Sequence, residues 1–528
     1  MNRRELLTAF LGAAVATSAC RRAPRREQVP GEIVDRALEL GHRLRGPPLP
    51  RATRFREVEV LIVGAGVAGL SAGWRLAAAG VNDFQILELD QAVGGTSRSG
   101  ASEVTAYPWG AHYLPAPLSA KGPVPRLLRE MGLWSREDQH GAPVFAEEAL
   151  IRTPEERVFY RGRWYEGLYL HAGASAEDLA QLARFEQRMA GFAAARDGRG
   201  RRAFAVPAAT SSDDAEWTAL DRLSMAQWLE QEDLRSDRLR WLVDYACRDD
   251  FGARAAHVSA WAGIWYFASR QDGKGKRSEG FLSWPEGNGR LVRHLAQANG
   301  PARLSTSVLV HAIEPGPDSV TVHALAGGAP VGFRARQVIL AAPRFVAARL
   351  VPGMAAPTGF TYSPWVVANL HLSRPPRSRG FPLAWDNVFY ESDSLGYVVA
   401  THQAARADDS GPTVLTWYYP MAGGEVAAER THALSLGYPE WEELVMSDLR
   451  RGHPALAATR LEVWRWGHAM IRPTPGFIWG PERRAPSPHP RLHLAHSDLS
   501  GVAIFEDANH QGVAAAEQIL GSQAGSWL

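Results

Sequence analysis

A glycine-rich segment between a predicted strand and a predicted helix carries the clearest chemistry in this sequence. Residues 58–63 are an apolar run rich in β-branched side chains, and residues 67–79 have the composition of a helix. In the turn between them, Gly64 allows a sharp bend, Gly66 lets a pyrophosphate approach the backbone, and Gly69 lets the helix pack closely on the strand. Free N–H groups at the helix start favour phosphate oxygens. The pattern predicts a dinucleotide site formed by Gly64, Gly66, Val67, Ala68 and Gly69.

A carboxylate at the end of the next predicted strand narrows the choice of dinucleotide. Residues 84–87 form that strand, and Glu88 ends it, followed by Leu89. A carboxylate at this position accepts hydrogen bonds from ribose hydroxyls and repels a 2′-phosphate. NADP is therefore disfavoured, and NAD or FAD is expected.

The segment that begins with this acid resembles a known family. Residues 88–100 read ELDQAVGGTSRSG and place Gly94, Gly95 and then Arg98 after the acid. With these residues the sequence resembles the flavin-containing amine oxidoreductase superfamily, which includes monoamine and polyamine oxidases, phytoene desaturases and protoporphyrinogen oxidase. The resemblance implies FAD, with the glycine backbone and the arginine against its pyrophosphate. Here a Thr-Ser pair separates the glycines from Arg98, whereas the family's arginine follows directly.

Further segments match the family in the same order along the chain. They are the crossing at 283–296, the strand meander at 302–343 and the closing block at 493–520. Within this last block, His496 stands where the family usually has glycine. The resemblance implies more FAD contacts: Gly110, Ala111, His112 and Tyr113 near the isoalloxazine, Val310 at the adenine, and Asp498 at the ribityl or pyrophosphate region.

The last predicted helix, residues 505–520, carries small residues at one face. Ala508, Gly512 and Ala516 recur at a spacing of four, which predicts close packing against a neighbouring element. The helix follows Ile504 directly, so its N-terminal N–H groups are expected at the pyrimidine edge of the flavin. A positive helix end there stabilises negative charge by about 1 kcal/mol.

The substrate side offers weaker candidates. Trp464, Trp466 and His468 precede the closing strand, where the amine oxidases place part of their active-site wall; ordinary packing is the alternative. Many amine oxidases also keep a lysine whose bound water faces the flavin. The only lysines in this sequence are Lys121, Lys274 and Lys276, which counts against an orthodox amine oxidase.

These motifs predict the fold class and the division into domains. We expect an α/β fold in which a doubly wound, Rossmann-like FAD-binding domain is assembled from separate segments, with a second, mixed α/β substrate lobe. The FAD-binding domain is assigned to residues 56–125, 280–345 and 460–528, and the substrate lobe to residues 126–279 and 346–459.

The N-terminal residues resemble an export signal. Arg3 and Arg4 precede an uncharged run from Leu6 to Ala19, too short to span a bilayer as a helix. The arginine pair resembles a twin-arginine signal, which exports folded proteins, and the residues before Cys20 resemble a lipoprotein cleavage box. We expect a signal peptide at 1–20, a linker at 21–55, and an exported protein, periplasmic or anchored through Cys20 on the outer side of the inner membrane.

Composition excludes some functions and leaves others open. With 58 basic and 56 acidic residues the net charge is +2, which argues against a nucleic-acid partner. A small-molecule substrate and no metal site are expected, and the oligomeric state stays open. The leading prediction is an FAD-dependent oxidoreductase that takes hydride from an amine. The alternatives are a desaturase or isomerase of an apolar polyene and a non-enzymatic flavin-binding lipoprotein.

Overall fold

The computed structural model of the chain describes residues 28–35, 37–137, 139, 143–271, 280–404, 410–484, 486–521 and 525–528. The predicted signal peptide with Cys20, and also Lys274 and Lys276, lie outside these residues. Within the described ranges, none of the helices combines the length and the apolar composition needed to cross a membrane.

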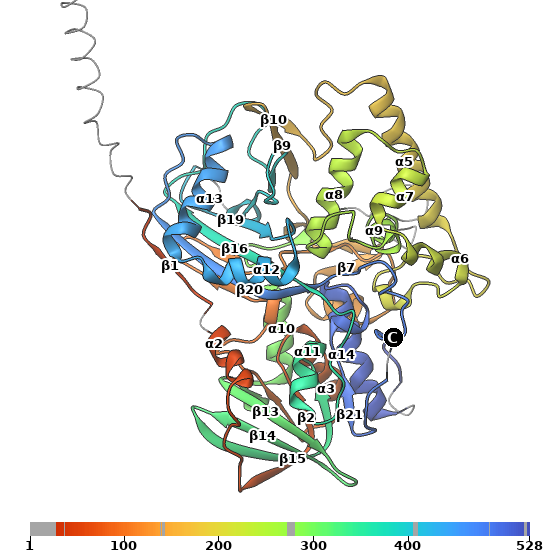
Figure 1. Ribbon diagram of the computed structural model, residues 1–528, viewed down its shortest axis with the longest axis vertical. Coiled ribbons are helices and arrows are strands. Elements are labelled where there is room, and N and C mark those ends of the chain that lie inside the picture. Colours follow the sequence, from red (N-terminus) through yellow and green to blue (C-terminus); the bar gives the residue numbers. More distant parts are fainter. Residues whose placement is uncertain are drawn as a thin grey trace, which may run out of the picture.

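The lower lobe in Figure 1 is built on a seven-stranded sheet that holds the glycine-rich turn. Its parallel part joins strands from the beginning, middle and end of the chain, and a three-stranded antiparallel meander extends it. The strands are β2 (Phe55–Val63), β3 (Phe84–Leu87), β12 (Leu304–Ser305), β13 (Val308–Pro315), β14 (Val320–Ala326), β15 (Ala329–Leu340) and β21 (Leu492–Leu494). This is the expected doubly wound domain assembled from separate segments.

Three helices pack together on this sheet because small residues let their backbones approach. They are α3 (Val67–Ala78), α10 (Gly289–Asn299) and α14 (Phe505–Leu520). A Cβ at Gly512 of α14 would lie 2.1 Å from the backbone oxygen of Ala68 in α3. The predicted close packing of the last helix is therefore against the helix that follows the glycine turn.

The upper lobe contains an eight-stranded sheet in the order β1-β20-β16-β19-β18-β17-β9-β10 (Figure 1). Its central strand β16 is buried along its whole length, and α12 and α13 pack at the β1 end. The elements are β1 (Gly31–Ile33), β9 (Glu156–Tyr160), β10 (Arg163–Glu166), β16 (Tyr362–Leu372), β17 (Asp386–Phe389), β18 (Tyr397–Val399), β19 (Thr413–Pro420), β20 (Arg460–Ile471), α12 (Val426–Ser435) and α13 (Tyr438–Gly452).

A group of helices beside this sheet forms a third, all-helical core rich in tryptophan. It comprises α5 (Ala176–Ala194), α6 (Ala215–Thr218), α7 (Met225–Gln231), α8 (Asp237–Phe251) and α9 (Ala260–Ala268). Trp261 and Trp265 are fully buried there, so they pack the core and do not line a substrate cavity. The remaining elements are α2 (Ala37–His42), α4 (Pro123–Glu130), α11 (Arg344–Leu350), β4 (Ser99–Ala101), β5 (Ala106–Pro108), β6 (Tyr113–Pro115), β7 (Trp134–Glu137), β8 (Pro143–Phe145) and β11 (Phe281–Ser283).

Two segments lie elsewhere than the sequence predicts. Residues 460–471, assigned to the FAD-binding domain, form β20 of the upper sheet, because this strand pairs with β16 on one side and β1 on the other. Residues 28–35 and 37–54, which belong to the predicted linker 21–55, cross from β1 in the upper lobe to the lower sheet, where Arg51 pairs with Glu314 at 2.7 Å. We call residues 28–35 and 37–54 the strap.

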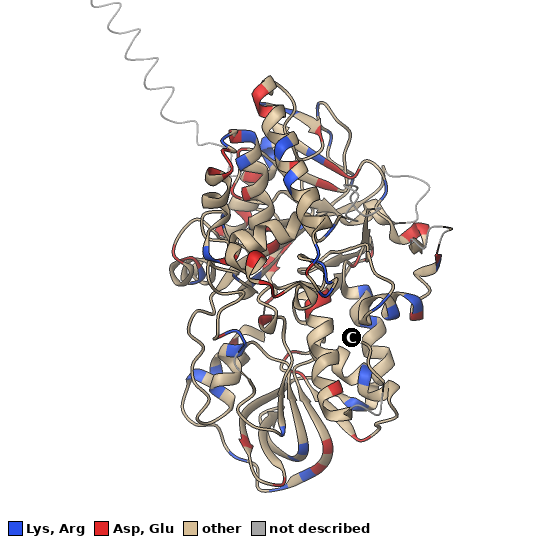
Figure 2. Cartoon of the chain, turned by 90° about the vertical axis from the view of Figure 1, so that its right-hand side faces the viewer, with Lys and Arg blue, Asp and Glu red and all other residues tan. Residues whose placement is uncertain are grey.

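In the cartoon of Figure 2, segments coloured for basic and for acidic residues are interspersed along the described chain. This distribution agrees with the small net charge of +2.

The helix contact at Gly512 predicts the effect of one added methyl group. Gly512→Ala places a Cβ against the Ala68 carbonyl, and such overpacking costs about 1–3 kcal/mol. We expect a melting temperature several degrees lower by differential scanning calorimetry. The control is Gly191→Ala in α5, where a Cβ meets nothing within 4 Å and helix propensity predicts a gain of up to about 1 kcal/mol. Equal melting temperatures for the two variants would contradict this account.

Candidate functional site

A cavity begins at the carboxyl ends of β2 and β3 and extends under α14 and β20. Most of the residues predicted to bind FAD line it. They are Gly64, Gly66, Val67, Ala68, Glu88, Leu89, Gly94, Gly95, Ala111, Val310, Asp498 and Ile504. Trp466 and His468, predicted for the substrate wall, line the same cavity.

Gly66 indicates what this cavity is shaped to hold. Its φ of −69° suits any residue, and a Cβ built on it would meet no protein atom within 4 Å. Neither backbone strain nor packing within the protein therefore accounts for glycine here. The missing side chain leaves the N-terminus of α3 open to the cavity, where backbone N–H groups and the helix dipole favour a phosphate. The site fits a dinucleotide in this respect.

Glu88 is held at the adenosine side of the cavity by backbone groups. Its Oε2 accepts a hydrogen bond from the N–H of Ala65 at 2.7 Å, and its Oε1 accepts one from the N–H of Asp90 at 3.0 Å. Burial raises the pKa of this carboxyl above its ordinary value. Ribose hydroxyls are suitable donors to such a buried carboxylate.

Asp498 is fixed at the other end by three neighbours. It accepts hydrogen bonds from the Tyr362 hydroxyl at 2.5 Å and from the N–H of Arg344 at 2.9 Å. His496 Nδ1 lies 3.0 Å from Asp498 Oδ1. Burial acts to raise the pKa of Asp498, but His496 and these hydrogen bonds hold it below its ordinary value. His496, the departure from the family's glycine, lines the cavity and orients this acid.

Some predicted residues lie outside this lining. Gly69 faces the Gly64 carbonyl, where a Cβ would lie at 1.8 Å, so it serves packing. Arg98 bonds Asp90 Oδ2 at 2.5 Å and the Ala92 carbonyl at 2.8 Å, and it lies 4.8 Å from the ring of Trp464. Because these contacts engage its guanidinium, Arg98 supports the glycine loop from outside the cavity. Trp464 also lies outside the cavity lining, against Arg98.

A second cavity adjoins the first. The two share Thr96, Ala111, Trp466, Ala469, Ala503, Ile504 and Phe505. Its walls are largely aromatic and apolar, and they include all four residues of the predicted isoalloxazine turn. Besides the shared residues, the walls contain Gly110, His112, Tyr113, Pro115, Trp365, Val367, Tyr418 and Met470. The position next to the dinucleotide cavity suits a substrate that must reach the reactive end of the cofactor.

One end of this second cavity carries buried charges that sequence reasoning missed. Asp249 and Asp250 lie in the last turn of α8, Arg270 follows α9, and Glu506 lies in the first turn of α14. Arg270 Nη2 donates to Asp250 Oδ2 at 2.5 Å. The Tyr113 hydroxyl lies 3.3 Å from Asp249 Oδ2 and 3.1 Å from Asp250 Oδ1.

Two of these carboxyls have strongly shifted pKa values. Burial raises the pKa of Glu506 to about 8, and burial together with Asp250 raises that of Asp249 to about 7. Glu506 is 4% exposed, and its Oε1 receives no hydrogen bond from any described residue. The sequence does show Asp249 and Asp250 as an adjacent pair of acids in a tryptophan-rich helical segment. No neighbouring residue indicates, however, that this pair faces a cavity.

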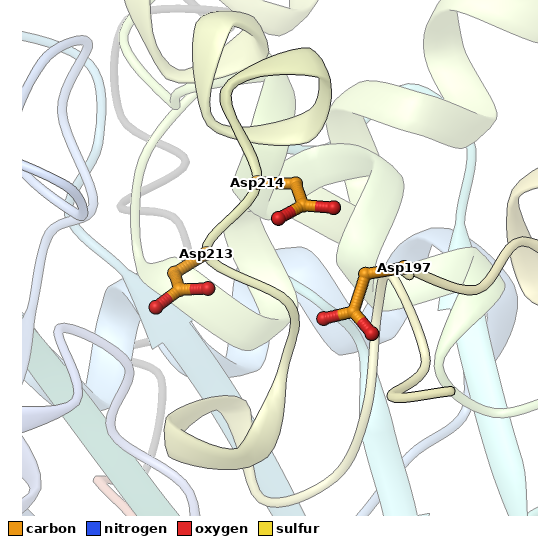
Figure 3. Close-up of side chains that lie close together, drawn as sticks. All are labelled: Asp197, Asp213 and Asp214. Atoms are coloured by element: carbon orange, nitrogen blue, oxygen red, sulfur yellow. The ribbon is translucent and has the colours of Figure 1, made fainter. Parts of the chain in front are cut away.

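Figure 3 shows another group of acids, Asp197, Asp213 and Asp214, in the helical part of the upper lobe. Arg201 pairs with both Asp197 and Asp213, and Arg199 pairs with Asp213. The carboxylates of Asp197 and Asp213 are thus neutralised by guanidinium groups, and we assign these two acids a structural role.

Sequence comparison gives the following relatives. A family model described as flavin containing amine oxidoreductase matches residues 67–520. The chain is also 25% identical over 281 residues to Oxidoreductase PigB of Serratia sp. (strain ATCC 39006), a match that covers 50% of this chain and 41% of that protein. The chain therefore spans less than half the length of this relative.

Solved structures share the fold. Wild-type putrescine oxidase bound to putrescine superposes with a TM-score of 0.64 at 17% identity, over 88% of this chain and 100% of that one. Cyclohexylamine oxidase from Brevibacterium oxydans IH-35A gives 0.60 at 16% identity, over 88% and 100%. A fatty acid isomerase from P. acnes gives 0.60 at 14% identity, over 86% and 97%. At these identities the likeness shows the fold alone, and it confirms the predicted fold class.

The open space at Gly66 predicts a variant that folds but does not hold its cofactor. In Gly66→Val the added Cβ meets no protein atom within 4 Å, and the glycine lines the dinucleotide cavity into which the side chain would project. We expect at least 100-fold weaker FAD binding, measured by fluorescence titration of the apoprotein, with unchanged far-ultraviolet circular dichroism. Gly198→Val, at another glycine with open space, is the matched control. A yellow Gly66→Val protein with normal FAD affinity would contradict the assignment.

Proposed function

Because this chain belongs to the flavin-containing amine oxidoreductase family, and therefore uses FAD, we propose that it oxidises an amine in the second cavity. When bound, oxidised flavin supplies a two-electron acceptor for a hydride from the carbon next to the substrate nitrogen. The chain itself must bind the amine, remove one proton from it and exclude water.

The carboxyl groups at one end of the second cavity carry this proposal. Asp249, Asp250 and Glu506 line one cavity with a single guanidinium, that of Arg270. A buried carboxylate without a cationic or hydrogen-bonding partner is costly. A substrate ammonium group offsets that cost and receives hydrogen bonds. An apolar polyene, the competing prediction, would set these polar groups against hydrocarbon.

Glu506 is the residue suited to take the substrate proton. An amine binds mainly as its ammonium form, whereas loss of hydride requires the neutral amine. With a pKa of about 8, Glu506 is a stronger base than an ordinary carboxylate and titrates near neutral pH. Its free Oε1 provides the acceptor. No lysine among the described residues of the cavity lining supplies this function.

The aromatic walls would hold the rest of the substrate and keep water out. Trp365, Tyr418 and Met470 line the cavity beside Trp466, which borders both cavities. His112 stacks on Tyr418 with ring centroids 4.7 Å apart, and burial lowers the pKa of His112 to about 4. This histidine is therefore neutral at physiological pH and adds no charge that would repel an ammonium group.

We also propose that the protein is exported, periplasmic or anchored by lipid at Cys20. The support lies in the sequence, namely the pair Arg3-Arg4, the short apolar run and Cys20. A twin-arginine route suits a protein that acquires FAD before it crosses the membrane. Cell fractionation tests this proposal, and recovery of the whole protein in the cytoplasm would contradict it.

Anaerobic bleaching of the flavin absorbance by a panel of amines tests the proposed reaction. We expect kcat/KM to rise with pH between about 7 and 8, because Glu506 and Asp249 must lose their protons before they can accept one. In Glu506→Gln the rate of bleaching should fall by roughly 10²–10⁴-fold, and the rise near pH 8 should disappear.

The matched control for this test is Glu440→Gln, at an exposed residue of α13. It should bleach at the rate of the unaltered protein. Bleaching by polyenes but not by amines would favour the desaturase alternative. Bleaching by neither class would favour a non-enzymatic flavin protein.

A further inference from the structure

We propose that the amine substrate also carries a carboxylate on the carbon that loses hydride, so that the substrate is an α-amino acid. Arg270 binds the carboxylate and Glu506 binds the amino group. This inference rests on the proposed amine oxidation and names its substrate class.

Arg270 has unused hydrogen-bond donors inside the cavity. Its side chain is 10% exposed, and only Nη2 is engaged, with Asp250 Oδ2 at 2.5 Å. Its Nε and Nη1 are buried and donate to no described residue. The guanidinium carbon lies 4.1 Å from the centroid of the Tyr266 ring, which fixes the plane of the group. Since a buried guanidinium donor without an acceptor is costly, the free nitrogens indicate an oxygen ligand.

Glu506, in the same cavity, lacks a hydrogen-bond donor where Arg270 lacks acceptors. Its Oε1 is a buried acceptor that receives no hydrogen bond from the described residues, and Arg270 forms its ion pair with Asp250 rather than with Glu506. A ligand that satisfies both side chains must present an acceptor to one and a donor to the other. The carboxylate and amino group of an α-amino acid do so from one carbon.

The oxidation of such a substrate balances without another reactant. The ammonium group gives one proton to Glu506. The Cα–H bond breaks, its hydrogen and both electrons leave as hydride to the flavin, and the nitrogen lone pair forms the C=N bond. The product is the imino acid. A simple amine would undergo the same change, but it would leave the two nitrogens of Arg270 without an acceptor.

The surroundings of the two side chains suit a charged, polar substrate. Arg270 and Glu506 also line a third cavity. Its other basic lining residues are Lys121, Arg201, Arg202 and His510. This cavity meets the second one at Arg270 and Glu506, which line both.

Matched substrates test the proposal on the holoenzyme. Both enantiomers of leucine, phenylalanine and tryptophan are compared with the amines that lack only the carboxylate, and anaerobic flavin bleaching gives kcat/KM. We expect at least one amino acid to exceed its own amine at least tenfold. If amines bleach the flavin and no amino acid is preferred, this inference is wrong while amine oxidation stands. If no member of either set bleaches it, both proposals fail.

Variants at Arg270 provide a readout apart from turnover. Binding of isovalerate and 3-phenylpropionate, which keep the carboxylate but lack the amine, is measured by calorimetry. Arg270→Met should weaken their binding at least tenfold, with partial recovery in Arg270→Lys. The double variant Arg270→Met/Asp250→Asn removes both charges of the ion pair and so leaves no unpaired buried carboxylate at Asp250. If the single variant does not fold, carboxylate binding is measured on this double variant instead.

Lys121→Met is the control for this experiment, since it removes a positive charge from the third cavity only. It should leave carboxylate binding within twofold. Equal weakening by Lys121→Met and the Arg270 variants, or unchanged binding in the Arg270 variants, would overturn the assignment of Arg270.

Discussion

The arrangement of the site depends on the close approach of three backbones around the glycine turn. Gly69 lies against the Gly64 carbonyl, and Gly512 lies against the Ala68 carbonyl. These contacts seat α14, from the end of the chain, on α3, from its beginning. As a result Ile504 and Phe505 stand where the dinucleotide cavity meets the substrate cavity, and Glu506 enters the latter. The cofactor and the proposed base are thus positioned by the same packing.

The parts of the site that could be predicted are those that local sequence specifies. The strand–turn–helix pattern around Gly66, the acid Glu88 and the small-residue face of α14 each follow from neighbouring residues. Arg98 differs, because a charge eight residues away, Asp90, and the Trp464 ring determine where its guanidinium lies. The pair Asp249–Asp250 could not be assigned, since its exposure to a cavity depends on how the helical part meets β16 and α14. Long-range packing decides such positions.

The buried acids of the second cavity lower the stability of the folded protein, and they are suited to bind a ligand. Asp249 and Glu506 lie near Asp250 in a region of low dielectric, where burial and the neighbouring acids raise the pKa of both. A protein selected for stability alone would replace such groups by apolar side chains. Their presence beside aromatic walls is therefore best explained by a ligand that brings compensating charge, and this reasoning links the electrostatics of the cavity to its chemistry.

The strap gives the protein a further property. Leu44 of the strap contributes to the wall of the dinucleotide cavity, while β1, at the start of the strap, is held in the upper sheet by the parallel pairing of three residues with β20. A bound nucleotide is therefore enclosed partly by a segment that is anchored in both lobes, since Val29 is buried in the core of the upper sheet and Leu44 packs against the core of the lower one. The same short stretch thus ties the wall of the coenzyme cavity to the sheet that carries β20, so that the two lobes are braced beside the coenzyme.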